Sequence, residues 1–91
     1  MDHVPEREFL ERVRRHAVQG ALILGRHAQQ RMIERNIMAE DVNNAAFTAT
    51  TAKFQRDKGT WRLEGGLDLD GEVVVLVVAP RDDGTFVVTV M

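Results

Sequence analysis

The sequence contains no cysteine and no tyrosine, and only 5% of its 91 residues are aromatic. Without cysteine, neither a disulfide framework nor a thiolate zinc site can form, and a reducing cytoplasmic setting is the natural expectation. A chain of this length supports one domain. We therefore expect residues 1–91 to form a single unit with a core of modest size.

Long hydrophobic runs are also missing. The longest, Val73–Ala79, is far too short to span a bilayer. The amino terminus opens with charged residues in place of an apolar signal sequence. These features predict a soluble protein that is neither exported nor bound to a membrane.

The formal net charge of −2 argues against general, sequence-independent binding to nucleic acid, which depends on clustered lysine and arginine. The charge is unevenly distributed, however. Residues 1–62 hold eleven Lys or Arg against eight Asp or Glu, whereas residues 63–91 hold one against six. The positively charged first part is therefore the candidate for contact with the phosphate groups of a nucleic acid. The acidic part is either plain solvated surface or a landing site for a basic partner.

Three helices are expected in the amino-terminal half. Apolar residues recur at helical spacing over residues 5–19, and Gly20 is suited to end that helix. A second helix should run from about Arg26 to Asn36, and a third should begin near Ala39 with small residues on its buried side. Residues 21–25 are either an apolar connection or a brief extended segment.

From Thr50 onward, β-branched and aromatic residues gather in short runs separated by Gly and Asp, which is typical of strands joined by tight turns. Pro80 should end the third strand. The sequence predicts an α+β fold with two to three amino-terminal helices (residues 1–50, mostly helical) packed on a four-stranded antiparallel sheet (residues 51–91). The candidate strands are Thr51–Arg56, Thr60–Gly65, Glu72–Ala79 and Thr85–Val90.

The second helix carries the most informative pattern, because His27, Arg31 and Arg35 are spaced four residues apart and share one face. Imidazole titrates near neutrality, and guanidinium is always charged and can bind phosphate oxygens through two hydrogen bonds. This combination suits a phosphodiester substrate. The alternative is an ordinary solvated face, with Glu34 forming an exposed salt bridge to its arginine neighbours.

Several elements together resemble a bacterial family of domains of unknown function that is found in toxin–antitoxin loci. They are a His-Ala-x-x-Arg-Met-x-x-Arg-x-Ile motif starting at His27, the Asp41-Val42 pair, a hairpin segment from Arg62 to Gly71, and the closing strand at 87–90. The resemblance covers roughly residues 21–91. Members of the family are similar to the small RelE and MqsR type ribonuclease toxins, whose BECR-type fold packs amino-terminal helices on an antiparallel sheet.

Two positions depart from the family pattern, which usually has Gly at position 36 and a small hydroxyl residue at position 38. Asn36 tolerates the left-handed conformation, so the helix end should survive. Met38 offers no side-chain oxygen as a helix cap, which should cost about 1 kcal/mol compared with Ser or Thr.

The resemblance implies an mRNA endonuclease that acts on free or ribosome-bound RNA and is neutralised by a cognate antitoxin. Because the sequence has no apparent cluster of metal ligands, we expect the cleavage to be independent of metal, and we expect no cofactor and no direct DNA binding. In such an enzyme the 2′-hydroxyl of RNA attacks the adjacent phosphorus. His27 would transfer a proton, and Arg31 and Arg35 would hold the phosphate. Arg62 would add a third cation, and Thr89 would donate a hydrogen bond from the last strand.

Two other hypotheses remain open from the sequence. One is a non-catalytic RNA-binding or ribosome-binding module, to which Trp61 and Phe54 would contribute if they stacked on bases, although we assign both rings first to the core. The other is an interaction protein whose acidic carboxy-terminal half or exposed sheet edge binds another protein.

Overall fold

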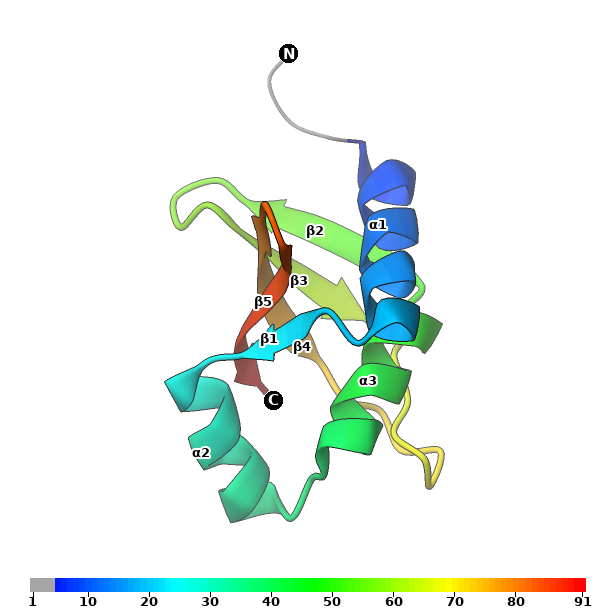
Figure 1. Cartoon of the computed structure of the whole chain (residues 1–91), viewed down its shortest axis with the longest axis vertical. Helices are drawn as coiled ribbons and strands as arrows, with labels where there is room; N and C mark the ends of the chain where they lie inside the picture. Colours follow the sequence, from blue (N-terminus) through cyan, green and yellow to red (C-terminus); the bar gives the residue numbers. More distant parts are fainter. Residues whose placement is uncertain (1–4) are drawn as a thin grey trace.

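The computed structural model describes residues 5–91, which form three helices and one five-stranded mixed sheet (Figure 1). This confirms the α+β class. In chain order the elements are α1 (Glu6–Gln19), β1 (Leu22–Leu24), α2 (Arg26–Arg35), α3 (Ala39–Thr48), β2 (Thr51–Gln55), β3 (Thr60–Glu64), β4 (Leu76–Arg81) and β5 (Gly84–Val90).

The helices begin and end close to the predicted residues. Gly20 closes α1 in the left-handed conformation with φ of 71°, and Asn36 closes α2 in the same way with φ of 58°. No side chain caps the amino terminus of α3 at Met38, as expected, although Asp41 Oδ2 accepts a 3.0 Å hydrogen bond from the Met38 N–H. Local capping chemistry therefore sets these boundaries.

The sheet differs from the prediction, because it has five strands instead of four and is not wholly antiparallel. Its order is β1-β5-β4-β3-β2, and β1 pairs parallel with β5 through the register Leu22 to Thr85 and Leu24 to Val87. The other neighbours are antiparallel. The apolar segment after α1 is thus an edge strand. Its partner lies about sixty residues further along the chain, too far for local sequence patterns to reveal.

The third predicted strand is shifted, since β4 covers Leu76–Arg81 and not Glu72–Ala79. Pro80 lies inside β4 opposite Thr85, so the expectation that it ends the strand is wrong. The Thr85 N–H donates to the Ala21 carbonyl of the segment before β1, which marks the Pro80–Thr85 pair as one without mutual hydrogen bonds. Pro80 therefore gives up no hydrogen bond to β5 by lacking an N–H group. It gives up none to β3 either, because β3 pairs with β4 only as far as Val78.

The core lies between one face of the sheet and the helices α1 and α3, and Ala28 and Met32 of α2 extend it beside β5. Phe9 of α1 stacks on Trp61 of β3 with ring centroids 4.3 Å apart and planes 11° apart. Trp61 is buried, which confirms its assignment to the core. Phe54 remains 38% exposed and only tilts against Trp61, so its assignment to the core is wrong: it lies on the edge strand β2.

The segment from Gly65 to Val75 forms a loop that α3 fixes in place. Three polar side chains one turn apart on α3 bind its backbone: Asp41 accepts from the Leu69 N–H, Asn44 donates to the Leu67 carbonyl, and Thr48 accepts from the Leu67 N–H, at 3.0, 2.9 and 2.8 Å. Within the loop, Asp68 Oδ1 accepts the N–H groups of Asp70 and Glu72. The loop is therefore a small hairpin of defined shape, closed by the predicted Asp-Gly turn.

Candidate functional site

The stripe predicted on the second helix is present on α2. His27 lies in its first turn, Arg31 in the middle and Arg35 at its last position, and all three side chains are exposed. Arg31 Nη1 is 3.6 Å from Glu34 Oε1, which confirms the exposed salt bridge. Such a pair contributes at most about 1 kcal/mol, so a phosphate can displace it.

The buried side of α2 separates two different flanks. Ala28 and Met32 enter the core, and at 100° per residue the His27 stripe lies on one side of them while Gln29 and Ile33 lie on the other. Ile33 is 82% exposed. The helix therefore presents a cationic flank and a separate flank with an exposed aliphatic side chain.

The position of α2 is set by β5. The Gly25 N–H, just before α2, donates to the Val87 carbonyl at 3.0 Å, and at the other end of the helix Arg35 lines a cavity together with Met91. A Cβ at residue 25 would lie 2.5 Å from the Phe86 ring and 3.0 Å from the Val87 carbonyl oxygen, so a larger residue would force the Phe86 ring to move and would crowd β5. Because no side chain caps the first turn of α2, its backbone N–H groups add positive potential beside His27.

Arg62 and Thr89 lie on the same face of the sheet, the one opposite α1. The registers place Lys53, Arg62, Val77 and Thr89 in one row across β2, β3, β4 and β5. Arg62 is thus two strands away from Thr89, or roughly 10 Å at ordinary strand spacing. No hydrogen bond or ion pair joins His27 to Arg62 or Thr89 within the described residues. The sheet row and the α2 stripe are thus separate surfaces, and β5, which carries Thr89, is also the strand that packs against α2.

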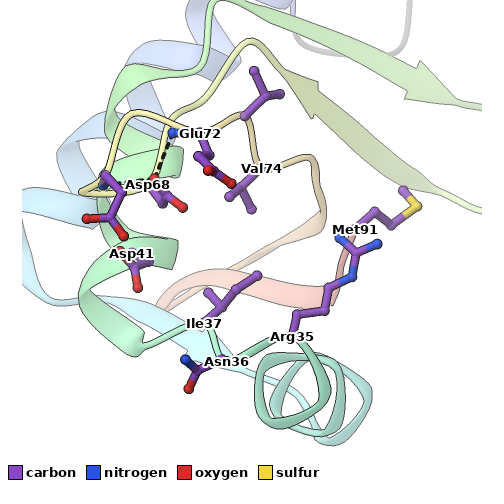
Figure 2. Close-up of a pocket in the computed structure, with 10 residues that line it drawn as sticks. Arg35, Asn36, Ile37, Asp41, Asp68, Glu72, Val74 and Met91 are labelled. Atoms are coloured by element: carbon purple, nitrogen blue, oxygen red, sulfur yellow. Dashed lines mark hydrogen bonds between the residues drawn. The ribbon is translucent and has the colours of Figure 1, made fainter.

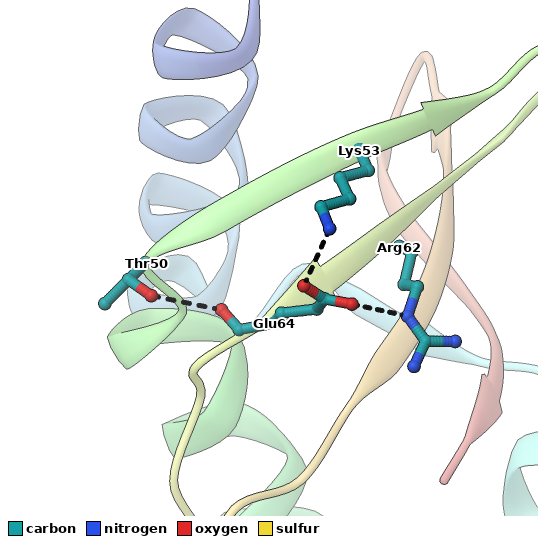
Figure 3. Close-up of polar contacts among 4 residues, drawn as sticks. All are labelled: Thr50, Lys53, Arg62 and Glu64. Carbon is teal, nitrogen blue, oxygen red and sulfur yellow. Dashed lines mark hydrogen bonds and ion pairs between the residues drawn. The ribbon is translucent and has the colours of Figure 1, made fainter.

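Glu64 holds the cations of the sheet row (Figure 3). Its carboxylate accepts a 2.7 Å hydrogen bond from Arg62 Nε and lies 3.4 Å from Lys53 Nζ. The Arg62 hydrogen bond is the main reason that the pKa of Glu64 lies below its usual value, and Lys53 lowers it further. Lys53 was not among the site residues predicted from the sequence. Alternate residues of a strand share one face, so the spacing along β2 could have placed Lys53 on the same face as Arg62.

A cavity of about 470 Å³ lies at the far end of the stripe. Figure 2 shows Arg35 next to Met91, across the cavity from Asp41 and Asp68. The Leu69 N–H, and to a lesser extent the Met38 N–H, hold the pKa of Asp41 below its usual value. These carboxylates disfavour an anion there. A phosphate would therefore bind nearer to His27 and Arg31 than to Arg35.

Within residues 5–91, no group of three or more His, Asp or Glu side chains is arranged to hold a metal ion. No helix in that part of the chain is both long enough and apolar enough to cross a membrane.

The fold and the site together define a small α+β domain with an exposed cationic flank on α2 and a separate polar row on the sheet face opposite α1. The chain belongs to the family described as a domain of unknown function (DUF4258), whose model matches residues 24–91. The match begins at the last residue of β1, so α1 and its core residues precede it. No curated protein and no solved structure gives a significant match to the chain.

Proposed function

We propose that this protein is a metal-independent endoribonuclease, the toxin of a bacterial type II toxin–antitoxin pair, with a relationship to the RelE and MqsR type toxins. The observation that supports the proposal is the exposed flank of α2, where His27 and Arg31 lie beside the uncapped first turn of the helix. A titratable imidazole, a permanent cation and free backbone N–H groups suit a phosphodiester.

In the proposed reaction the 2′-hydroxyl of RNA attacks the adjacent phosphorus, and the bond from phosphorus to the 5′ oxygen breaks. The products are a 2′,3′-cyclic phosphate and a free 5′-hydroxyl. His27 transfers a proton, either taking it from the attacking hydroxyl or giving it to the leaving oxygen. Arg31 stabilises the charge that accumulates on the phosphate oxygens, and Arg35 adds to the potential.

The remaining parts of the proposal concern binding and partners. RNA that continues from α2 over β5 would meet Thr89 and then Arg62, which share one row of the sheet. The substrate would be mRNA, either free or on the ribosome, in the cytoplasm. A cognate antitoxin would be the protein partner, and we propose no membrane or direct DNA contact.

The test is incubation of purified protein with RNA in excess EDTA, alone and with ribosomes, followed by mapping of the fragment ends. We expect fragments ending in 2′,3′-cyclic phosphate, a loss of about 10²–10⁴-fold in rate for His27→Ala, and a smaller loss for Arg31→Ala. Arg56→Ala, which removes an exposed cation from the turn after β2, serves as the matched control. Circular dichroism checks that each variant folds. Absence of cleavage by folded wild-type protein, or full activity of His27→Ala, would refute the proposal.

One observation favours a second candidate, a non-catalytic RNA-binding module. In the described residues no hydrogen bond orients the His27 ring, whereas a catalytic imidazole is usually held by a neighbouring group. Such a module would bind RNA in a salt-sensitive manner, with Lys53, Arg62 and Arg31 all contributing, and would yield no product. Salt-sensitive RNA binding in a gel-shift assay, by wild-type protein that yields no fragments in the cleavage experiment, would select it.

A further inference from the structure

Exposed apolar side chains gather on one side of the molecule, away from the His27 stripe. Of the seven large hydrophobic side chains that the described residues leave exposed, five line two adjoining cavities of about 470 and 660 Å³. These five are Val18, Ile33, Met38, Phe47 and Leu69. Clustered exposed apolar surface of this kind typically marks an interaction site.

The two cavities belong to one groove, which we call the α3 groove and define by Ile33, Met38, Ala39, Val18, Phe47 and Leu69. Ala39 lines both cavities. A third cavity of about 90 Å³, lined by Gly20, Leu24, Ala39 and Asn43 among others, lies between them. The groove thus runs from α2 past the edge strand β1 and the start of α3 to the end of α1 and Leu69 of the 65–75 loop. Figure 1 shows how these elements are arranged.

The charge that lines the α3 groove is negative. Glu40 is the only charged residue among those that line its three cavities in the described part of the chain. Asp41, Asp68 and Asp70 adjoin groove residues in the sequence but line the neighbouring acidic cavity. No lysine or arginine lines the groove in residues 5–91. A ligand that combines apolar and basic side chains is complementary to this surface.

The far wall of the groove is preformed. Leu69 is held at the loop tip by the hydrogen bond from its N–H to Asp41, and Asn44 and Thr48 bind the Leu67 backbone. An ordered wall reduces the conformational entropy that a ligand must overcome on binding.

We propose that the α3 groove binds a cationic amphipathic segment of a partner protein, with aliphatic or aromatic side chains seated between Ile33 and Leu69 and basic side chains facing Glu40. A second copy of this chain paired groove to groove fits less well, because no lysine or arginine lines the groove to pair with Glu40 of the other copy. The groove contains neither His27 nor Arg31, so the partner site stands apart from the proposed ribonuclease site.

The test uses two synthetic peptides of about 14 residues that share leucines at helical i, i+3, i+4 and i+7 spacing, one with lysine and one with glutamate at the other positions. Calorimetry measures affinity, and amide shifts in ¹⁵N-labelled protein locate the site. We expect the lysine peptide to bind at least ten-fold more tightly, with shifts concentrated at Gly20, Ala39, Asn43 and Leu69.

Variants distinguish specific binding in the α3 groove from nonspecific hydrophobic binding. Phe47→Ser and Leu69→Ser should each weaken binding of the lysine peptide at least ten-fold. The matched control is Val73→Ser, since Val73 is 65% exposed but lines the neighbouring acidic cavity and not the groove. Equal affinity for the two peptides, shifts centred outside the groove, insensitivity to Phe47→Ser and Leu69→Ser, or a dimer in sedimentation that buries the groove would each overturn the proposal.

Discussion

His16 Nδ1 and Thr85 Oγ1 lie 2.7 Å apart and join the last turn of α1 to β5. Thr85 is fully buried, and it is the one polar residue in the buried set of the described chain. Partial burial, together with the charges of Arg12 and Arg15, places the pKa of His16 below its usual value. The hydrogen bond is therefore made by a neutral imidazole near neutral pH.

Lowering the pH should destabilise the fold through His16. The unfolded side chain has a pKa near 6.5 and the folded one a lower pKa, so the unfolded chain binds the proton first. The stabilising contribution is complete above pH 6.5 and is lost as pH falls from 6.5 through the folded pKa. Urea unfolding between pH 7.5 and 5.5 measures this, with His16→Gln as a non-titrating reference. A wild type whose pH dependence matches that of His16→Gln would contradict it.

Removing the Trp61 ring should be among the most damaging core changes. Trp61 contacts both Phe9 and Phe54, and Trp61→Ala should lower the free energy of unfolding by about 3–5 kcal/mol. Phe54→Ala, on the exposed side of the same cluster, should cost roughly 1 kcal/mol. Chemical denaturation distinguishes them. Similar losses for both variants would show that the stack contributes less than its geometry indicates.

Supplying the missing cap at position 38 should stabilise the protein. In Met38→Ser the new hydroxyl can accept a hydrogen bond from an N–H in the first turn of α3, while Asp41 already accepts from the N–H of residue 38. The expected gain is about 1 kcal/mol in the free energy of unfolding. Met38→Ala, which removes the same exposed thioether without providing an oxygen, is the control and should lie below Met38→Ser in midpoint denaturant concentration.

Adding a methyl group at Gly66 should disrupt the contact between the loop and α3. A Cβ there would lie 2.2 Å from the Ala45 carbonyl oxygen, which is backbone and cannot turn away. We expect Gly66→Ala to lose roughly 3 kcal/mol of stability. Gly59→Ala is the comparison, since its Cβ meets open space and only the positive φ of 67° is unfavourable, at about 1–2 kcal/mol. Thermal melts that rank the two variants in the opposite order would be inconsistent with the geometry.

Features encoded by neighbouring residues were predictable from the sequence. The end of α2 at Asn36 follows from one residue that tolerates the left-handed conformation, and the His27 stripe follows from helical spacing alone. The strand β1 was not predictable, because three residues give no alternation and its partner is remote. The α3 groove was also hidden, since Val18, Ile33 and Leu69 meet only after folding. The hydrogen bond from Arg62 to Glu64 was not predicted either, and it weakens the contribution to phosphate binding that the sequence suggested for Arg62.

The position of β5 between β1 and β4 has a consequence for biosynthesis. Translation produces α1, β1 and α2 well before Gly84–Val90, yet β1 pairs with β5 and α2 packs against it. In a nascent chain that lacks these residues, β1 has no strand to pair with and α2, the helix that carries His27, has no strand to pack against. Any activity of this helix should therefore switch on only after the final strand has been translated, which makes prematurely terminated products inert.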